Sequence, residues 1–338
     1  MTKQAPDRST DLTARRANRY NADVMETMMR VERCIVALSG LLLTVGCGDK
    51  GGAGPGGTNP TDSGATGTGP AFEDFINVDV VYTATQMDYT PGTDWLTRTA
   101  DPSCLKDQTL DGLVSDFQED EPVPGASVEM YFNDDIDAAA DVSVDEVDSE
   151  GKFSATAPVC KAIGYKTSTP VEWEETKDTY EVHQVWGYEA DGVLSETLNS
   201  VSIATASIIP AVLGVEWDPS TGIIAGTAYD SAEEPITGAQ VFIHDGTGKA
   251  PPLVSIFYFI SSFPNASQPY SSEDGLWVAV NVPVGTWTAE MWVWDGTQHV
   301  KLGQTVLNIK PDSVNISNIF TGFGDGIRLP DSCLSVCG

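Results

Sequence analysis

The chain has 338 residues, of which 41% are hydrophobic and 20% charged, and its formal net charge is −31. This charge excludes nucleic acid as a partner, because phosphate binding depends on Lys and Arg displacing counterions. It also opposes docking on anionic lipid headgroups. The favoured interpretation of the charge is solubility through self-repulsion, and the length leaves room for two domains of ordinary size.

The N-terminal segment predicts export. Residues 34–46 form an uncharged, largely apolar stretch that follows Arg30 and Arg33. It is shorter than the roughly 20 residues of a membrane-spanning helix, and a basic region followed by a short apolar run is typical of a secretory signal. Residues 1–27 are polar, so we expect translation to start at Met28 or Met29. A long N-terminal extension of the signal is the alternative.

The end of this segment, Leu43-Thr44-Val45-Gly46-Cys47, resembles a bacterial lipobox. Gly46 fits that pattern, whereas Thr44 stands where leucine is usual. The resemblance implies cleavage before Cys47 and lipidation of this cysteine, which would anchor the chain to a membrane. An ordinary secretory signal with a chance cysteine is the alternative. Gly48 in place of Asp favours the outer over the inner membrane of the cell envelope.

The segment after Cys47 predicts a spacer. Nine of residues 48–70 are glycine and none is large and apolar. Such a sequence cannot bury enough surface to offset its ordering entropy, so we expect a disordered, flexible tether. Residues 47–338 hold 11 of the 18 basic and 44 of the 49 acidic residues, a net charge of −33.

Four cysteines follow the tether. An even number in an exported chain predicts disulfides, and four cysteines allow three pairings. Sequence proximity favours Cys104–Cys160 and Cys333–Cys337. Their spacing lacks the paired CxxC of a zinc site, so no metal is expected there.

An internal repeat occupies the rest of the chain. Each copy contains a strand-like stretch, a Glu-Pro turn leading to Gly-Ala, and a Gly before an aromatic residue. The first copy shows these at 112–116, 121–128 and 149–153, and the second at 226–230, 234–241 and 273–277. Short branched and aromatic runs between Gly and Pro turns predict β-strands. A repeat of this length indicates two all-β domains, each an antiparallel β-sandwich.

The repeated pattern resembles the carboxypeptidase regulatory-like domain, a transthyretin-like (prealbumin-type), Ig-like β-sandwich. The second copy matches at Gly226, Asp230, Pro235, Ile236, Gly238, Ala239, Val241, Asp274, Gly275, Trp277, Gly285 and Trp287. The first matches at Gly112, Val114, Asp116, Pro122, Val123, Gly125, Ala126, Val128, Gly151 and Phe153, and its last element, Ile163-Gly164-Tyr165, is distorted. The resemblance implies an accessory module whose motif residues are structural, sometimes with a ligand-binding surface.

These features divide the chain into five parts. We expect a signal region at 1–46, the lipidated cysteine and linker at 47–72, and a β-sandwich at 73–215. The carboxypeptidase regulatory-like sandwich follows at 216–325, and a tail with two cysteines at 326–338.

An acidic stretch lies in the first sandwich, at Asp134, Asp135, Asp137, Asp141, Asp145, Glu146, Asp148 and Glu150. Calcium needs several oxygen ligands, and Asp145, Asp148 and Glu150 are weak candidates. The central glycine and spacing of an EF-hand are absent. A solvated acidic loop is therefore the favoured interpretation, and no other cofactor is expected.

Alternation in the strand expected over 287–294 separates two faces. Trp287, Ala289, Met291 and Val293 form the better core face, and Trp292 and Trp294 lie on the other face beside Glu290. Exposed aromatic residues need a reason. Trp292 and Trp294 could stack on a glycan or peptide. Alternatively, the neighbouring domain or the apolar run 253–260 could cover them, and this second interpretation is favoured.

The sequence offers no catalytic pattern. The three histidines, His183, His244 and His299, form no HExxH motif, and neither a GxSxG motif nor a Walker loop occurs. We therefore expect a non-enzymatic, membrane-anchored surface lipoprotein acting as a structural or adhesive binding module, with a glycan or another envelope protein as partner. The alternatives are a carbohydrate-binding accessory protein using Trp292 and Trp294, and an enzyme with an unrecognised site.

Overall fold

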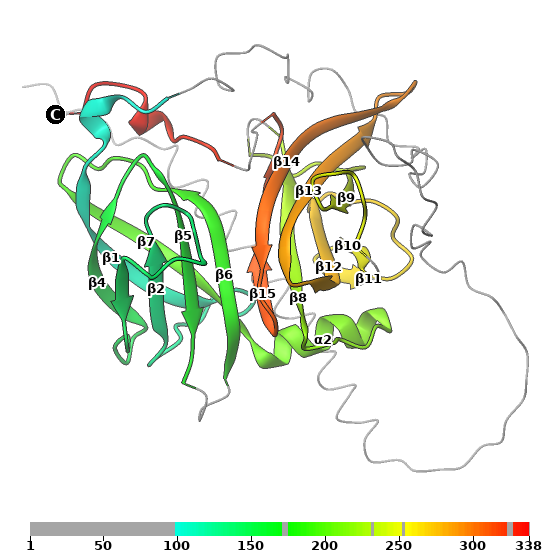
Figure 1. Cartoon of the computed structure of the whole chain (residues 1–338), viewed down its shortest axis with the longest axis horizontal. Helices are drawn as coiled ribbons and strands as arrows, with labels where there is room; N and C mark the ends of the chain where they lie inside the picture. Colours follow the sequence, from blue (N-terminus) through cyan, green and yellow to red (C-terminus); the bar gives the residue numbers. More distant parts are fainter. Residues whose placement is uncertain (1–98, 171–174, 231–232, 252–253, 323–326, 338) are drawn as a thin grey trace, which may run out of the picture. The chain divides into compact units, whose positions relative to one another are not determined.

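A computed structural model describes residues 99–170, 175–230, 233–251, 254–322 and 327–337 (Figure 1). The signal, Cys47 and the glycine-rich segment lie outside these residues, so the predictions made for them stay predictions. Almost all regular structure in the described part is β-strand, which confirms the all-β fold class.

Seven of the described strands build the first copy of the repeat. β1 pairs antiparallel with β4 and parallel with β7, and β5 lies between β2 and β6 in the opposing group. A buried apolar cluster that includes Leu110, Val128, Ile163 and Leu198 fills the space between them. The strands are β1 (Asp107–Asp116), β2 (Ser127–Tyr131), β3 (Val142–Val144), β4 (Lys152–Pro158), β5 (Ala162–Ser168), β6 (Thr176–Val185) and β7 (Val193–Ser202).

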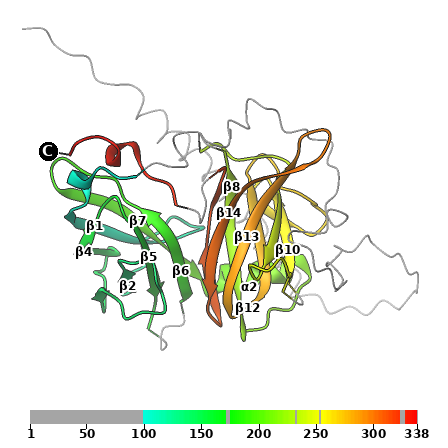
Figure 2. The ribbon, with the colours of Figure 1, turned by 45° about the horizontal axis from the view of Figure 1, so that its top comes forward.

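The second copy follows the same plan. β8 pairs antiparallel with β12 and parallel with β15, and β13 lies between β9 and β14, with β13 and β14 forming the long hairpin of Figure 2. Its core includes Ile224, Ile243, Met291 and Leu307. The strands are β8 (Thr221–Tyr229), β9 (Gln240–His244), β10 (Ser255–Ile260), β11 (Phe263–Asn265), β12 (Leu276–Pro283), β13 (Gly285–Trp294), β14 (His299–Ile309), β15 (Ser313–Ile316) and β16 (Ile319–Phe320).

The motif glycines have matching roles in the two copies. Gly151 and Gly275 have φ of 73° and 66°, and a Cβ at either would lie 2.8 Å from a backbone oxygen, that of Val114 or of Ala228. These glycines also accept hydrogen bonds from the same two residues, at 2.8 and 2.9 Å. Left-handed backbone in close contact with another strand favours glycine. The repeat seen in the sequence is therefore a repeat of backbone geometry and strand order.

β15 joins the two copies into one sheet. It runs parallel to β6 of the first copy and to β8 of the second, with Val314 opposite Thr179 and Ile223. Thirteen of the described strands are connected in this way. Most strand pairs are antiparallel, as predicted, but β1 pairs parallel with β7, and β15 and β16 pair parallel with their neighbours, because each copy returns to its first strand through a crossover. The domain boundaries at 215 and 216 stay a prediction.

A helix, α2 (Ile203–Leu213), links the two copies. Ser202 caps its first turn by accepting from the Thr205 amide at 3.1 Å, and Gly214 ends it with φ 72°. Ala206 and Leu213 pack in a cluster with Ile223, Val278 and Val314. α2 therefore covers an apolar surface of β8, β12 and β15. Among the described residues, no helix has the length and apolar character needed to cross a membrane.

Candidate functional site

Two disulfides tie the C-terminal segment to the first copy, in an arrangement that we call the disulfide clasp: Cys104–Cys337 and Cys160–Cys333. The pairing favoured by sequence proximity, Cys104–Cys160 with Cys333–Cys337, is wrong. The reason is that the chain after β16 comes back to the short helix η3 (Pro102–Cys104) that precedes β1. Fold, and not sequence separation, decides which thiols meet.

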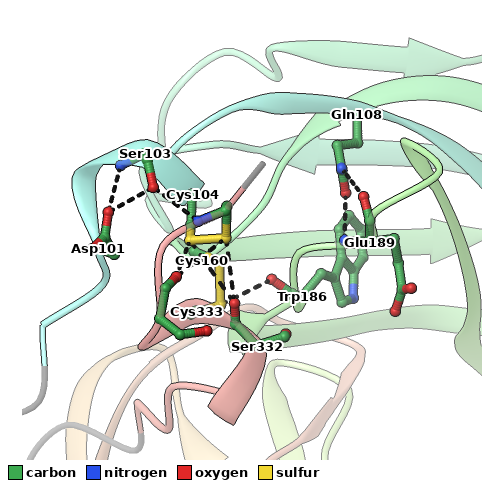
Figure 3. The surroundings of a disulfide bond; sticks show 11 residues. Asp101, Ser103, Cys104, Gln108, Cys160, Trp186, Glu189, Ser332 and Cys333 are labelled. Carbon is green, nitrogen blue, oxygen red and sulfur yellow. Dashed lines mark hydrogen bonds between the residues drawn. A yellow bond between two sulfur atoms is a disulfide. The ribbon is translucent and has the colours of Figure 1, made fainter.

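Hydrogen bonds reinforce the clasp (Figure 3). The Asp101 amide donates to the Cys333 carbonyl at 2.8 Å, and the Cys337 amide donates to Ser103 Oγ at 2.9 Å. Asp101 also accepts from the Ser103 hydroxyl at 2.7 Å, and hydrogen bonds from Ser103 lower the pKa of this carboxyl. Cys104 and Cys333 are fully buried. The two ends of the folded chain therefore form one cross-linked structural unit.

The clasp closes very long loops. The bonded cysteines are 233 and 173 positions apart. A cross-link restricts the unfolded chain, and the restriction grows slowly with loop length. The clasp can therefore contribute several kcal/mol, on the order of 2–5, to the stability of the body that it encloses.

β13 carries the residues predicted as a ligand platform. Ala289, Met291 and Val293 are buried in the core, as the alternation indicates. Trp292 and Trp294 point to the other face but are only half-exposed. The Trp292 indole N–H donates to Glu290 Oε2 at 2.9 Å, and the Trp294 ring lies tilted against His299 with 5.0 Å between centroids. Both tryptophans therefore contact residues of their own sheet, and they do not form a fully exposed pair.

Glu290 is the centre of a polar cluster on this sheet. Its carboxylate accepts from Lys301 Nζ and lies 3.3 Å from His244 Nε2. Burial alone would raise the pKa of Glu290, but the hydrogen bonds from His244, Lys301 and Trp292 outweigh burial and lower this pKa to about 2. Lys301 Nζ also donates to Gln304 at 2.5 Å. The cluster joins three adjacent strands by charged hydrogen bonds, an arrangement that stabilises a sheet.

The weak calcium candidates serve local structure. Asp148 Oδ1 accepts the amides of Glu150 and Lys152, both at 2.8 Å, and Lys152 Nζ pairs with Glu150 at 2.6 Å. Asp145 is exposed. Within the described ranges, no three acidic, His or Cys side chains are grouped as metal ligands. Calcium binding at these residues stays a prediction.

Most of the acidic side chains are exposed, in keeping with a solvated acidic loop, but the segment between β2 and β3 also packs against protein at Asp134 and Ile136. Ile136 is 7% exposed and belongs to the buried cluster that also holds Val182 of β6 and Leu307 of β14. Asp134 contacts His183, and Asp137 contacts Asn308 of β14 and Lys310, which directly follows β14. The acidic composition indicated solvent, whereas the apolar Ile136 was the signal that this loop packs against protein.

A cavity of about 400 Å³ opens beside this contact. Its lining includes His183 and Gln184 of β6, Thr305 of β14, and the charged residues Glu233, Arg328 and Asp331. Elsewhere a buried group joins Tyr165, Glu181 and Asn199, with Asn199 Nδ2 donating to Glu181 at 2.9 Å. Burial raises the pKa of Glu181. This group does not line the cavity, so the two do not combine into one site.

The comparisons with known proteins assign no family. No protein-family model matches the chain. No curated protein matches it either. The solved Bacillus anthracis TIE protein aligns with 64% of the chain at 13% identity and a TM-score of 0.22, over 33% of its own length. The chain thus spans about a third of that protein.

Two pilins align at similar levels. The shaft pilin SpaA from Lactobacillus rhamnosus GG aligns with 67% of the chain and 100% of its own length, at 11% identity and a TM-score of 0.20. BcpA, the major pilin subunit of Bacillus cereus, aligns with 64% of the chain and 100% of its own length, at 10% identity and a TM-score of 0.19. At these scores the alignments carry no functional assignment.

Proposed function

We propose that the chain is a membrane-anchored surface lipoprotein of the cell envelope, whose folded part is a structural or adhesive binding module and not an enzyme. The disulfide clasp is the observation that carries this proposal. Disulfides form and persist in oxidising compartments, in keeping with the export signal before Cys47. The partner would be another envelope protein or a glycan, and Gly48 favours the outer membrane.

The position of the clasp fits a chain that is held at its N-terminal side. An anchor at Cys47 would lie N-terminal to Cys104, which is bonded to Cys337. Force applied between Cys104 and Cys337 would pass through this covalent bond and would not peel β1 from β4 and β7. A module with this property suits a structural or adhesive role.

We also propose that the two copies of the repeat are related to carboxypeptidase regulatory-like domains. The matched backbone of Gly151 and Gly275 supports it, since these motif positions need glycine for the same reason in both copies. A sugar platform at Trp292 and Trp294 is not included, because both rings are half-buried and the Trp292 N–H is held by Glu290.

Labelling with a tagged fatty acid tests the anchor. We expect the wild-type chain to incorporate the label and Cys47→Ser to lose it, with the protein released from membranes. Cys34→Ser, which removes the other cysteine of the signal region, is the matched control and should keep the label. Equal labelling of wild type and Cys47→Ser would refute the anchor.

A further inference from the structure

His183 connects three elements of the molecule. It lies on β6 with φ 62°, an uncommon backbone conformation for a residue other than glycine. Its amide donates to Asp134 Oδ1 at 2.8 Å, and ring Nδ1 contacts Asp134 Oδ2. Ring Nε2 lies 2.6 Å from the carbonyl oxygen of Val306 on β14. One side chain therefore bridges the β2–β3 loop of the first copy and a strand of the second.

The two ring contacts require two protons. A carbonyl oxygen only accepts, so Nε2 must carry a hydrogen to bond Val306. An ionised carboxylate also only accepts, so Nδ1 must carry a hydrogen to bond Asp134. Neutral imidazole has a single N–H. A neutral imidazole and an ionised carboxylate together carry one such hydrogen. Both hydrogen bonds therefore form together only when the Asp134–His183 pair has bound one additional proton.

The Asp134–His183 pair is largely, but not fully, buried. The side chains of His183 and Asp134 are 15% and 12% exposed. Among the described residues, the charged groups near the pair include Asp137 of the same loop, Lys310 directly after β14, and the cavity residues Glu233, Arg328 and Asp331. Lys310 is paired with Asp137, and Arg328 with Glu233. Both of these cations are therefore matched by carboxylates, so they oppose a second proton on the ring less than unpaired cations would.

We propose that Asp134, His183 and Val306 form a proton-dependent latch between the two copies of the repeat. With both ring nitrogens protonated, the latch holds the loop that inserts Ile136 into the second core. When the pair loses the extra proton, one contact becomes a repulsion between two lone pairs. The latch thus stabilises the closed arrangement at acidic pH and weakens as the pH rises, and this property goes beyond the proposed surface role.

Asp134→Asn is a sharp test of the latch. The introduced carboxamide keeps an oxygen for the His183 amide, and its NH₂ group can donate to Nδ1 of a neutral ring whose Nε2 still bonds Val306. Urea titrations at pH 5.5 and pH 8.5 give the equilibrium constant for unfolding of each protein. The increase of this constant with pH should be about tenfold larger in the wild type than in Asp134→Asn. This factor is the effect of losing one hydrogen bond to a charged group. His299→Gln, which replaces a histidine outside the latch, should behave as wild type.

Equal pH dependence in wild type and Asp134→Asn would overturn the latch. Amide hydrogen exchange of the wild type gives a second readout that needs no variant to fold. Protection of the His183 amide, which donates to Asp134, relative to that of Leu110 of β1, corrected for intrinsic exchange, should fall from pH 5.5 to 8.5. A ratio that stays constant would also overturn the latch.

Discussion

Cys104 is bonded to Cys337 across 233 positions of sequence, so the start and the end of the described chain meet at one point. The first strand of the fold and the last residues of the protein are thereby fixed together. We expect this bond to contribute more to stability than any single non-covalent contact at the same place.

The double variant Cys104→Ser/Cys337→Ser should lower the free energy of unfolding by about 2–5 kcal/mol, because it frees the long loop in the unfolded state. Urea unfolding followed by tryptophan fluorescence measures the change. Under reducing conditions, wild type and variant should unfold at nearly the same urea concentration. A difference that persists after reduction would mean that the substitution acts through packing and not through the cross-link.

Gly226→Ala should be severely destabilising. A Cβ at residue 226 would lie 1.6 Å from the backbone oxygen of Ser317, so the chain between β15 and β16 would have to move. We expect a loss of more than about 3 kcal/mol, or failure to fold, because overpacking against backbone is not relieved by a rotamer change. Gly246→Ala is the control, since nothing lies within 4 Å of its Cβ position. Its positive φ should cost only about 1 kcal/mol, and similar losses in both variants would contradict the prediction.

Glu290 should make stability depend on acid pH. Its pKa in the folded chain is about 2, below the ordinary glutamate value of about 4.3. A depressed pKa contributes stability that is present above the unfolded value and is lost as the pH falls toward the folded value. Glu290→Gln should therefore lower the free energy of unfolding by about 3 kcal/mol at pH 7 and by much less at pH 2.5. The exposed Glu273→Gln is the control, and urea titrations at both pH values decide the outcome.

Ile136→Ala tests whether the acidic loop is part of the core. The side chain is buried against the second copy, so its truncation should cost about 2–4 kcal/mol in thermal or urea unfolding. Asp135→Ala, one residue earlier and exposed, should change stability by less than about 0.5 kcal/mol. Equally small effects of the two substitutions would show that the loop does not pack in the core.

Local patterns predicted much of this fold. The Gly-Ala turns and the glycines before Phe153 and Trp277 mark the starts of β2, β4, β9 and β12. Alternation in β13 placed Ala289, Met291 and Val293 in the core. Both kinds of signal depend on a few consecutive residues, which is why they could be read without the structure.

The non-local features could not be read in that way. The cysteine pairing depends on where the last residues return, and the insertion of β15 between β6 and β8 depends on a crossover. α2 has no charged residue in Ile203–Leu213, so a search for amphipathic helices passes over it. His183 is a lone histidine in sequence, and only the fold brings Asp134 and Val306 to its ring.

The most direct test of the proposed function is mass spectrometry of unreduced peptides from the protein isolated with its membrane. We predict an N-terminal peptide that begins at an acylated Cys47, together with peptides cross-linked as Cys104–Cys337 and Cys160–Cys333. An unmodified Cys47 inside a longer peptide, or Cys333 joined to Cys337, would contradict the proposal.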